Sequence, residues 1–250
     1  MTDALFSFEK GIAMIISHEH KAYQSKWNKL GAGRWNGAYY YSKEIVENII
    51  PNIKTDRNWI TVNLNGIGAD HSIVFVHNNK NPQNYEWLKQ YKDLILVCGV
   101  PDTVEKVKHL GKAIYLPLSI DTEYVKQFKK DKKKKGSAYF GRRSKATNLP
   151  DGTQIISGLP REELLKRMND FENIYAVGRC ALEGSYLGAN ILPYSDEYPN
   201  PKLWKVLDNS DAVKILQKEL DKIDKPKKET KKTTKKKTSS KKTKKSDKDA

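Results

Sequence analysis

Residues 171–194 read FENIYAVGRCALEGSYLGANILPY, and this stretch decides which fold the chain is expected to adopt. Its apolar runs and glycines predict a buried strand, a glycine turn, a short helix, a second glycine turn and a second buried strand. These elements are assigned, in order, to Ile174–Val177, Gly178, Cys180–Leu187, Gly188 and Ala189–Leu192. A strand–helix–strand unit is the building block of a parallel sheet, so the stretch predicts an α/β fold.

Polar and small residues follow the carboxyl end of the first of these strands: Arg179, Glu183, Gly184 and Ser185. Ligands of open parallel sheets bind at that edge. A carboxylate there can accept the hydroxyls of a ribose, and the free N–H groups at the start of a helix can hold a phosphate. The alternative is that Glu183 is a solvated helix residue and that the glycines only form turns. The local pattern leaves both interpretations open.

Upstream of this stretch, apolar runs and helical patterns alternate with short connections. This order predicts a doubly wound parallel sheet. The expected strands are Ile12–Ile16, Trp59–Asn63, Ser72–Val76, Asp93–Cys98 and Ala113–Leu116, and the expected helices are Lys43–Ile50, Pro82–Tyr91 and Asp102–His109.

Residues 118–136 interrupt the alternation with a charged helix and the run Lys132–Lys135. The pattern then restarts at the strand Ser137–Phe140 and ends with an amphipathic helix at Asp211–Ile223. We therefore expect two Rossmann-like domains, residues 1–118 and 119–224, with the carboxyl edges of their sheets facing each other across a cleft.

The charge of the chain is concentrated at its C-terminal end. The net charge is +16, and residues 225–250 contribute 13 lysines against three acidic residues. Such a low-complexity Lys/Thr/Ser segment is expected to be disordered. It can attract nucleic acid by counterion release without recognising a base sequence. An anionic membrane surface and a solubility tail without a partner are the alternatives.

Several classes of protein are disfavoured by what the sequence lacks. Cys98 and Cys180 show no metal-binding spacing and are expected to be reduced core residues. No apolar run approaches the roughly 18 residues that a membrane-spanning helix needs. The N-terminal residues MTDALFSFEKG lack the basic start of a secretion signal. These features predict a cytoplasmic protein, and they leave its oligomeric state open.

Five short stretches, taken in order, resemble the nucleotide-sugar glycosyltransferases of the two-Rossmann-domain (GT-B) type, particularly group 1/family 4. From Ser72 to Tyr194, these stretches extend over about half of the chain. The stretches are Ile73–His77 (IVFVH), Asp93–Asp102 with its following helix, Ala113–Asp121 (AIYLPLSID), Ala138–Lys145 (AYFGRRSK) and Ala181–Ile191 (ALEGSYLGANI).

The resemblance implies a role for particular residues. Gly141, Arg142 and Lys145 match the loop that binds the donor diphosphate, which becomes the leaving group and needs cations. Glu183 matches the glutamate that holds the donor ribose, and His77 matches a histidine that approaches the sugar and the acceptor. The implied donor is a UDP- or GDP-type nucleotide sugar, and no further cofactor or metal is required. The alternatives are that Arg142 and Lys145 are ordinary surface cations and that His77 only bonds a neighbouring loop.

The sequence also departs from the family pattern. Tyr175 stands eight positions before Glu183, where the family usually has a second glutamate, so retention or inversion of the sugar stays open. Gly184 and Asn190 replace an alanine and a proline. The chain is shorter than usual for the family, as is typical of proteins from viruses or other compact genomes, which would place it in the host cytoplasm.

The sequence His18-Glu19-His20 follows the first expected strand and offers an acceptor-side base, for which Glu19 or His18 is preferred. The two histidines would point to opposite faces of an extended chain, so they are not expected to share a metal ion. A plain polar loop is the alternative. The aromatic-rich segment Trp27–Tyr41 would hold a DNA strand or a flipped base, or else form a hydrophobic cap on the sheet.

We therefore expect a glycosyltransferase whose preferred acceptor is a nucleic-acid base, such as a modified viral DNA base. The acceptor is inferred from the basic tail and the small size. One alternative is a non-catalytic protein that keeps the double Rossmann scaffold and binds nucleic acid. The other is a transferase acting on lipid or cell-wall acceptors at a membrane surface.

Overall fold

A computed structural model describes residues 5–6, 15–16, 37–61, 68–76, 82–194, 203 and 205–224, with side chains from Tyr41 onward except Pro82. Several of the predicted features lie outside these residues. They are His18, Glu19, His20, His77, most of the aromatic segment Trp27–Tyr41, and residues 225–250.

The first sheet has six strands, and their order in the sheet follows their order in the sequence. The edge strand β1 is antiparallel to β2, whereas β2 to β6 are parallel, with β3–β6 forming a four-stranded parallel block. Every residue of β4 and β5 is buried, as expected for strands covered on both faces. The strands are β1 (Leu5–Phe6), β2 (Ile15–Ile16), β3 (Asn58–Thr61), β4 (Ser72–Val76), β5 (Leu94–Cys98) and β6 (Lys112–Tyr115).

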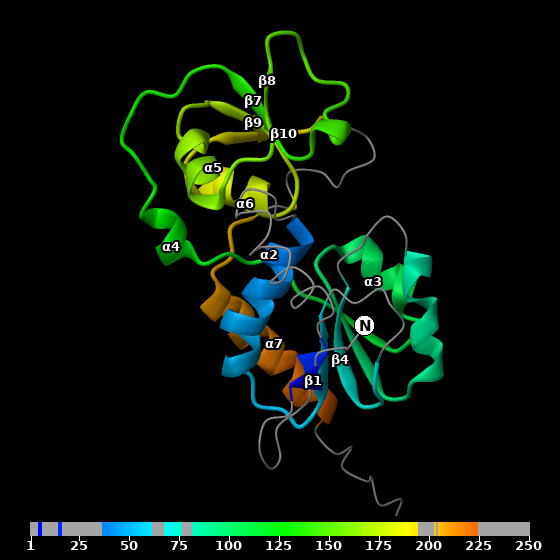
Figure 1. Ribbon diagram of the computed structural model, residues 1–250. Coiled ribbons are helices and arrows are strands. Elements are labelled where there is room, and N and C mark those ends of the chain that lie inside the picture. Colours follow the sequence, from blue (N-terminus) through cyan, green and yellow to red (C-terminus); the bar gives the residue numbers. More distant parts are fainter. Residues whose placement is uncertain are drawn as a thin grey trace, which may run out of the picture.

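Helices cover both faces of this sheet (Figure 1). On one face, the apolar sides of η2 and α7 pack against Trp59, Ile73 and Phe75. On the other face, η4 and α3 bury residues such as Val74 and Leu96. The helical elements of this unit are α2 (Gly37–Glu44), the π-helix η2 (Ile45–Ile49), the 3-10 helices η3 (Ile50–Asn52) and η4 (Pro82–Gln90), α3 (Pro101–Val107) and α7 (Asn209–Asp224).

The second sheet has four parallel strands in the order β10-β9-β7-β8. Its helices α4, α5 and α6 pack on one face, around Phe140, Ile174 and Leu182. The elements are α4 (Thr122–Lys126), β7 (Ser137–Phe140), the 3-10 turn η5 (Arg143–Lys145), β8 (Gln154–Ile156), α5 (Arg161–Met168), β9 (Asn173–Tyr175), α6 (Arg179–Tyr186) and β10 (Asn190–Leu192).

The opposite face of the second sheet carries three buried tyrosines, Tyr139, Tyr175 and Tyr194. The rings of Tyr139 and Tyr194 meet edge to face, with centroids 5.1 Å apart. Within the described residues, the β7–β8 connection covers this face through Ala146 and Leu149. The helical element of that connection is the short 3-10 turn η5. The mixed α/β class expected from the sequence is therefore confirmed, and among the described residues the α-helices of this sheet lie on one face.

The last helix lies in an unexpected place. The sequence assigned residues 119–224 to the second unit, yet Ala212, Leu216 and Leu220 of α7 are buried against the first sheet. Ile120 pairs with Asp208 in an isolated parallel bridge, where the chain leaving the first unit meets the chain returning to it. The spacing of apolar residues shows that α7 has one buried face, but it does not show which sheet buries that face.

Most expected elements are present within a few residues of their predicted bounds. The helix expected at Lys43–Ile50 begins earlier, at Gly37, and continues as η2. The helix expected at Pro82–Tyr91 is instead the 3-10 helix η4. Among the described residues, no helix is both long and apolar enough to cross a membrane.

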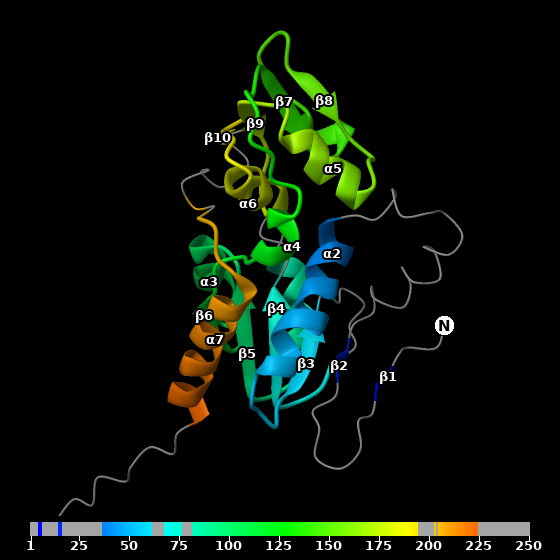
Figure 2. The same ribbon diagram turned by 90° about the vertical axis from the view of Figure 1, so that its left-hand side faces the viewer.

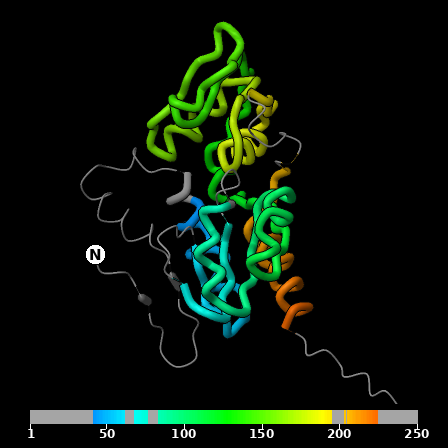
Figure 3. Tube along the Cα trace, turned by 90° about the vertical axis from the view of Figure 1, so that its right-hand side faces the viewer, coloured from blue at the N-terminus to red at the C-terminus, as the bar shows by residue number. Residues whose placement is uncertain are grey.

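The carboxyl ends of strands from both sheets approach the same side chain, Leu118. Gly99 follows β5, and a Cβ built on it would lie 2.8 Å from Leu118 Cδ2. Gly178 follows β9, and a Cβ there would lie 3.8 Å from Leu118 Cδ1. Figures 2 and 3 show the two units one above the other, with α4 and α6 at their junction in Figure 2.

Candidate functional site

The loop after β7 contains three of the predicted donor-binding residues, Gly141, Arg142 and Lys145. The Tyr139 hydroxyl donates a hydrogen bond to the Arg142 carbonyl oxygen, 3.0 Å away, and this contact holds the loop over the end of its strand. A Cβ at Gly141 would collide with the Tyr139 hydroxyl, so glycine allows the loop backbone to lie close to the Tyr139 side chain. The side chains of Arg142 and Lys145 are exposed.

The strand order of the second sheet reverses at β7. The chain passes from β7 to its neighbour β8 on one side and then returns to β9 on the other side. Tyr139 of β7 is paired with Tyr175 of β9, so the loops that follow these strands leave the same edge side by side. Ligands of open parallel sheets bind at such a reversal, outside the carboxyl ends of the two strands. The Gly141 loop and the start of α6 therefore flank the expected ligand position.

Glu183 lies on the buried side of α6, and none of its surface is exposed. Its Oε1 atom is 2.6 Å from Arg161 Nη2 on α5 and 3.3 Å from Arg179 Nη2 one turn earlier on α6. Its Oε2 atom is also buried and has no hydrogen-bond partner. Buried carboxylate oxygens are normally hydrogen-bonded, so this oxygen needs an explanation.

The ion pairs continue into the first unit through Arg179. Its Nη2 atom lies 3.3 Å from Glu44 Oε2, at the end of α2. Glu44 Oε1 in turn accepts hydrogen bonds from Asn209 Nδ2 at 2.5 Å and from Asn48 Nδ2 at 3.1 Å. Two arginines and two glutamates thus form a charge-balanced cluster that joins α5 and α6 to α2 and the first residue of α7.

The protein environment keeps Arg161 charged and Cys180 neutral. Burial by itself lowers the pKa of Arg161, but the charge and hydrogen bond of Glu183, with a contribution from Glu44, raise that pKa above its ordinary value. Burial, together with the charge of Glu183, raises the pKa of the Cys180 thiol to about 12, against the opposing effects of Arg161 and Arg179. Cys180 therefore stays protonated near neutral pH and is not a nucleophile.

The two residues after Glu183 have structural explanations. Gly184 is buried, and a Cβ there would lie 3.1 Å from the Cδ1 atoms of both Ile174 and Ile191. This glycine allows α6 to pack closely on strands β9 and β10. The Ser185 carbonyl accepts a hydrogen bond from the Gly188 N–H at 2.9 Å and helps to end the helix. Close packing explains Gly184 without any ligand.

The structure brings together some of the predicted site residues and adds others. Arg179 and Glu183 are in contact, as their i, i+4 spacing on a helix allows. Arg161 and Glu44 were not predicted, because their partners are distant in the sequence and their helices show no pattern that would reveal a buried charge. The predicted catalytic residues His77, Glu19 and His18 lie outside the described residues, so their roles stay predictions.

The described part of the chain contains no group of three or more His, Cys, Asp or Glu side chains that could hold a metal ion. Comparisons with known proteins do not assign the chain to a family. No protein-family model matches the chain, and no curated protein or solved structure is significantly similar to it. The functional argument therefore rests on the residues of this chain.

Proposed function

We propose that the protein is a glycosyltransferase that binds a nucleotide-sugar donor at the carboxyl edge of its second sheet. The observation that carries this proposal is the reversal of strand order between β7 and β9, with the Gly141 loop beside it and α6 beginning on its other side. Such a reversal is the usual position of a nucleotide ligand in an open parallel sheet.

The exposed side chains of Arg142 and Lys145 would bind the donor diphosphate. Phosphate oxygens accept charge-assisted hydrogen bonds from such cations, and these bonds strengthen as negative charge develops on the leaving group. The loop backbone is fixed by Tyr139, which donates to the Arg142 carbonyl oxygen at 3.0 Å. A fixed loop reduces the conformational entropy that is lost when the diphosphate binds.

Glu183 would accept a hydrogen bond from a donor ribose hydroxyl through its Oε2 atom. This oxygen has no partner in the structure, while Arg161 and Arg179 hold the other carboxylate oxygen. A hydroxyl that reaches Oε2 would remove the cost of an unsatisfied buried acceptor, which is about 1–3 kcal/mol. The two arginines would fix the orientation of the carboxylate.

The acceptor in this proposal is a nucleic-acid base, and His77 with Glu19 or His18 would act on the acceptor side. In the sequence, His18 and Glu19 follow β2 and His77 follows β4, and the carboxyl end of β5, the neighbour of β4, approaches Leu118. The donor would be a UDP- or GDP-type sugar, without an added cofactor.

The direct test is to incubate the full-length protein with a panel of nucleotide sugars and to measure thermal stabilisation and sugar release. The variant Arg142→Gln/Lys145→Gln should bind the donor about tenfold more weakly or worse, because each lost charge-assisted bond costs roughly 1.5–3 kcal/mol. Arg143→Gln is the control from the same loop, since it removes one exposed cation to which the proposal gives no role. Failure of every donor to bind, or equal losses in both variants, would overturn the proposal.

Glu183→Gln is the appropriate variant for the ribose contact, since it keeps an oxygen that can face the arginines. It should weaken donor binding while the protein remains folded, as checked by circular dichroism. An unchanged donor affinity in a folded Glu183→Gln protein would remove the ribose role.

A non-catalytic nucleic-acid-binding protein is the second candidate. One observation favours it: both carboxylates of the buried cluster are already neutralised by arginines, as in a cluster that serves only to join the two units. Donor binding without sugar transfer or donor hydrolysis, in the presence of DNA, would favour this candidate.

A further inference from the structure

The connection between α4 and β7 carries the densest charge of the described residues. Residues 126–135 contain seven lysines and one aspartate. All of these lysines except Lys134 are exposed. Figure 1 shows the connection on the outside of the second unit, away from α3. A run of like charges is commonly a disordered, solvated segment, so its conformation needs an explanation.

A buried asparagine at the end of α5 holds the backbone of this segment. Asn169 has no exposed surface, and its Nδ2 donates to the carbonyl oxygens of Phe128 at 2.8 Å and Leu165 at 3.1 Å. Its Oδ1 accepts a hydrogen bond from the Lys130 N–H at 3.1 Å. The Lys135 N–H then donates to the Asp170 carbonyl oxygen at 3.0 Å. The lysines are therefore presented on a fixed backbone.

Acidic side chains compensate little of this charge. Within the described residues, the ion pairs of the segment are those of Lys126 with Glu123 and of Lys132 with Asp170. Burial lowers the pKa of Lys134, and repulsion from Lys132 and Lys129 lowers it further. The segment thus produces a concentrated positive potential, which attracts polyanions.

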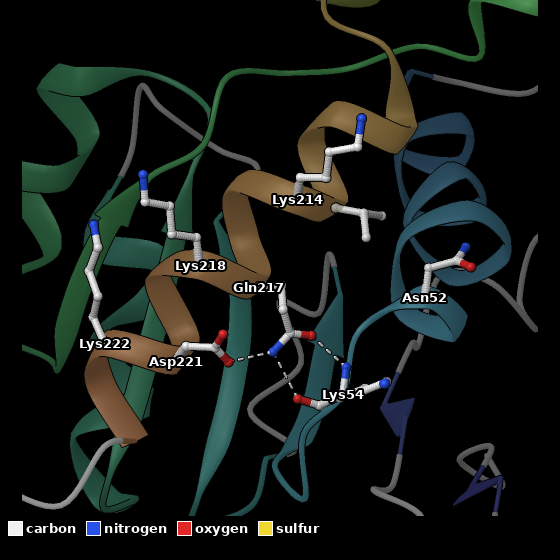
Figure 4. Close-up of a pocket in the computed structure, with 8 residues that line it drawn as sticks. Asn52, Lys54, Lys214, Gln217, Lys218, Asp221 and Lys222 are labelled. Atoms are coloured by element: carbon white, nitrogen blue, oxygen red, sulfur yellow. Dashed lines mark hydrogen bonds between the residues drawn. The ribbon is translucent and has the colours of Figure 1, made fainter.

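A second row of lysines lies on α7. Lys214, Lys218 and Lys222 recur every four residues and line a shallow groove together with Lys54 and Asp221 (Figure 4). Lys214 is 2.8 Å from Asp211 and Lys222 is 2.5 Å from Glu219, so this row is less positive than the segment 126–135. Gln217 fixes Lys54 against the helix, because its Oε1 accepts from the Lys54 N–H at 2.7 Å and its Nε2 donates to the Lys54 carbonyl oxygen at 3.1 Å. Residues eight positions apart on a helix are about 12 Å apart, so the row spans a few phosphates of a nucleic acid.

The two sets of lysines belong to neighbouring parts of the fold. The Thr122 hydroxyl at the start of α4 donates to the Asp208 carboxylate just before α7, at 2.5 Å. In Figure 2 both α7 and the α4–β7 connection face the viewer. The 13 lysines of residues 225–250 follow directly after α7 in the sequence.

We propose that the lysine segment 126–135 and the α7 lysine row form one surface that binds the phosphate backbone of duplex DNA. Lysines on a fixed scaffold suit phosphates, and the absence of arginines within these two sets predicts binding without base recognition. A membrane surface fits less well, because the exposed large apolar side chains of the described residues, Tyr115, Leu203 and Val206, lie outside both sets. This proposal does not depend on donor binding.

The test compares two full-length variants that each lose four positive charges. One is Lys129→Gln/Lys130→Gln/Lys133→Gln/Lys135→Gln, in the lysine segment. The control is Lys89→Gln/Lys106→Gln/Lys108→Gln/Lys112→Gln, whose lysines are exposed on η4, α3 and β6. Binding to a short duplex of arbitrary sequence is measured by fluorescence anisotropy at several salt concentrations. The slope of the logarithm of the binding constant against the logarithm of the salt concentration should fall in magnitude by about one for each lysine that contacts a phosphate. We therefore expect a decrease of at least about 2 in the segment variant and of less than about 1 in the control.

Equal slopes in the two variants would show that only overall charge matters and would overturn the proposal. Preferential binding to anionic phospholipid vesicles over DNA, with the same sensitivity to the segment variant, would also overturn it. Donor binding, measured on the same proteins, should be unchanged in the segment variant. A failure of the DNA surface is therefore distinguishable from a failure of the donor site.

Discussion

Two arginine–carboxylate clusters, one at each unit's edge, differ in which partner is buried. In the first unit, Arg57 is 2.7 Å from Asp224 and 3.1 Å from Asp93, and its side chain is 5% exposed while theirs are 38% and 58% exposed. In the second unit the carboxylate of Glu183 is fully buried, and Arg161 and Arg179 surround one of its oxygens. The first cluster buries a cation beside hydrated anions, and the second buries an anion.

This difference separates a structural clamp from a candidate binding site. If Arg57 is lost, water can solvate the aspartates that remain. If Glu183 is lost, two largely buried guanidinium groups lose a counter-charge that water cannot replace easily. Arg57 ties the end of α7 to the first sheet, whereas the Glu183 cluster contains an unpartnered oxygen beside the reversal of strand order.

The largest effect is expected for Glu183→Ala. It should lower the free energy of unfolding by about 3–5 kcal/mol, because it leaves Arg161 and Arg179 buried with an incomplete set of counter-charges. Urea denaturation followed by circular dichroism measures this change. A loss below about 1 kcal/mol would mean that water already enters the cluster.

A smaller effect is expected for Arg57→Met, which keeps the aliphatic packing and removes the hydrogen bonds to Asp93 and Asp224. The free energy of unfolding should fall by roughly 2 kcal/mol, since the exposed aspartates regain water. The same denaturation experiment tests the comparison between the clusters. An Arg57 variant less stable than the Glu183→Ala variant would reverse our interpretation of the two sites.

The stability contributed by the Arg57 cluster should also depend on pH, through His71. Hydrogen bonds to Asp93, and then to Asp56, raise the pKa of His71 above its ordinary value of 6.5, against the opposing effects of burial and of Arg57. The stability that protonated His71 contributes is therefore fully present below pH 6.5 and is lost as the pH rises through the raised pKa. The effect should be small, because the side chain is 42% exposed.

Unfolding free energies measured across this pH range test the effect. His71→Gln should remove the decline, whereas His109→Gln, at an exposed histidine paired with Glu86, should keep it. A decline that persists in the His71 variant would exclude this histidine as its source.

The smallest effect is expected for Gly184→Ala. The added methyl group must displace the Cδ1 atoms of Ile174 and Ile191 slightly, while alanine gains about 1 kcal/mol of helix propensity over glycine. The two effects oppose each other, so stability should change by less than about 1 kcal/mol. If Gly184→Ala lowered the free energy of unfolding as much as Glu183→Ala, the second cluster would depend on the packing of α6 and not on its charges.

Much of the fold was predictable because its strands are apolar runs. Ser72–Val76 and Ser137–Phe140 have the same bounds in the sequence-based prediction and in the structure. The strand–helix–strand unit at residues 171–194 is also confirmed, with α6 at Arg179–Tyr186 between β9 and β10. Local hydrophobic patterns determine such elements, and those patterns are visible without any tertiary contact.

The sequence by itself thus determined the α/β class, the parallel strand–helix–strand unit, the glycine loop after β7 and the excess of lysine at the C-terminal end. Only the tertiary structure decided that α7 packs on the first sheet and that Glu183 is buried between two arginines. The physical reason is that an apolar stripe must be buried and a buried charge must be paired, but the sequence contains many residues that could serve as the partner. Which partner it meets depends on how distant elements pack. That packing placed Arg161 beside Glu183 and left the buried Oε2 atom of Glu183 without a hydrogen-bond partner.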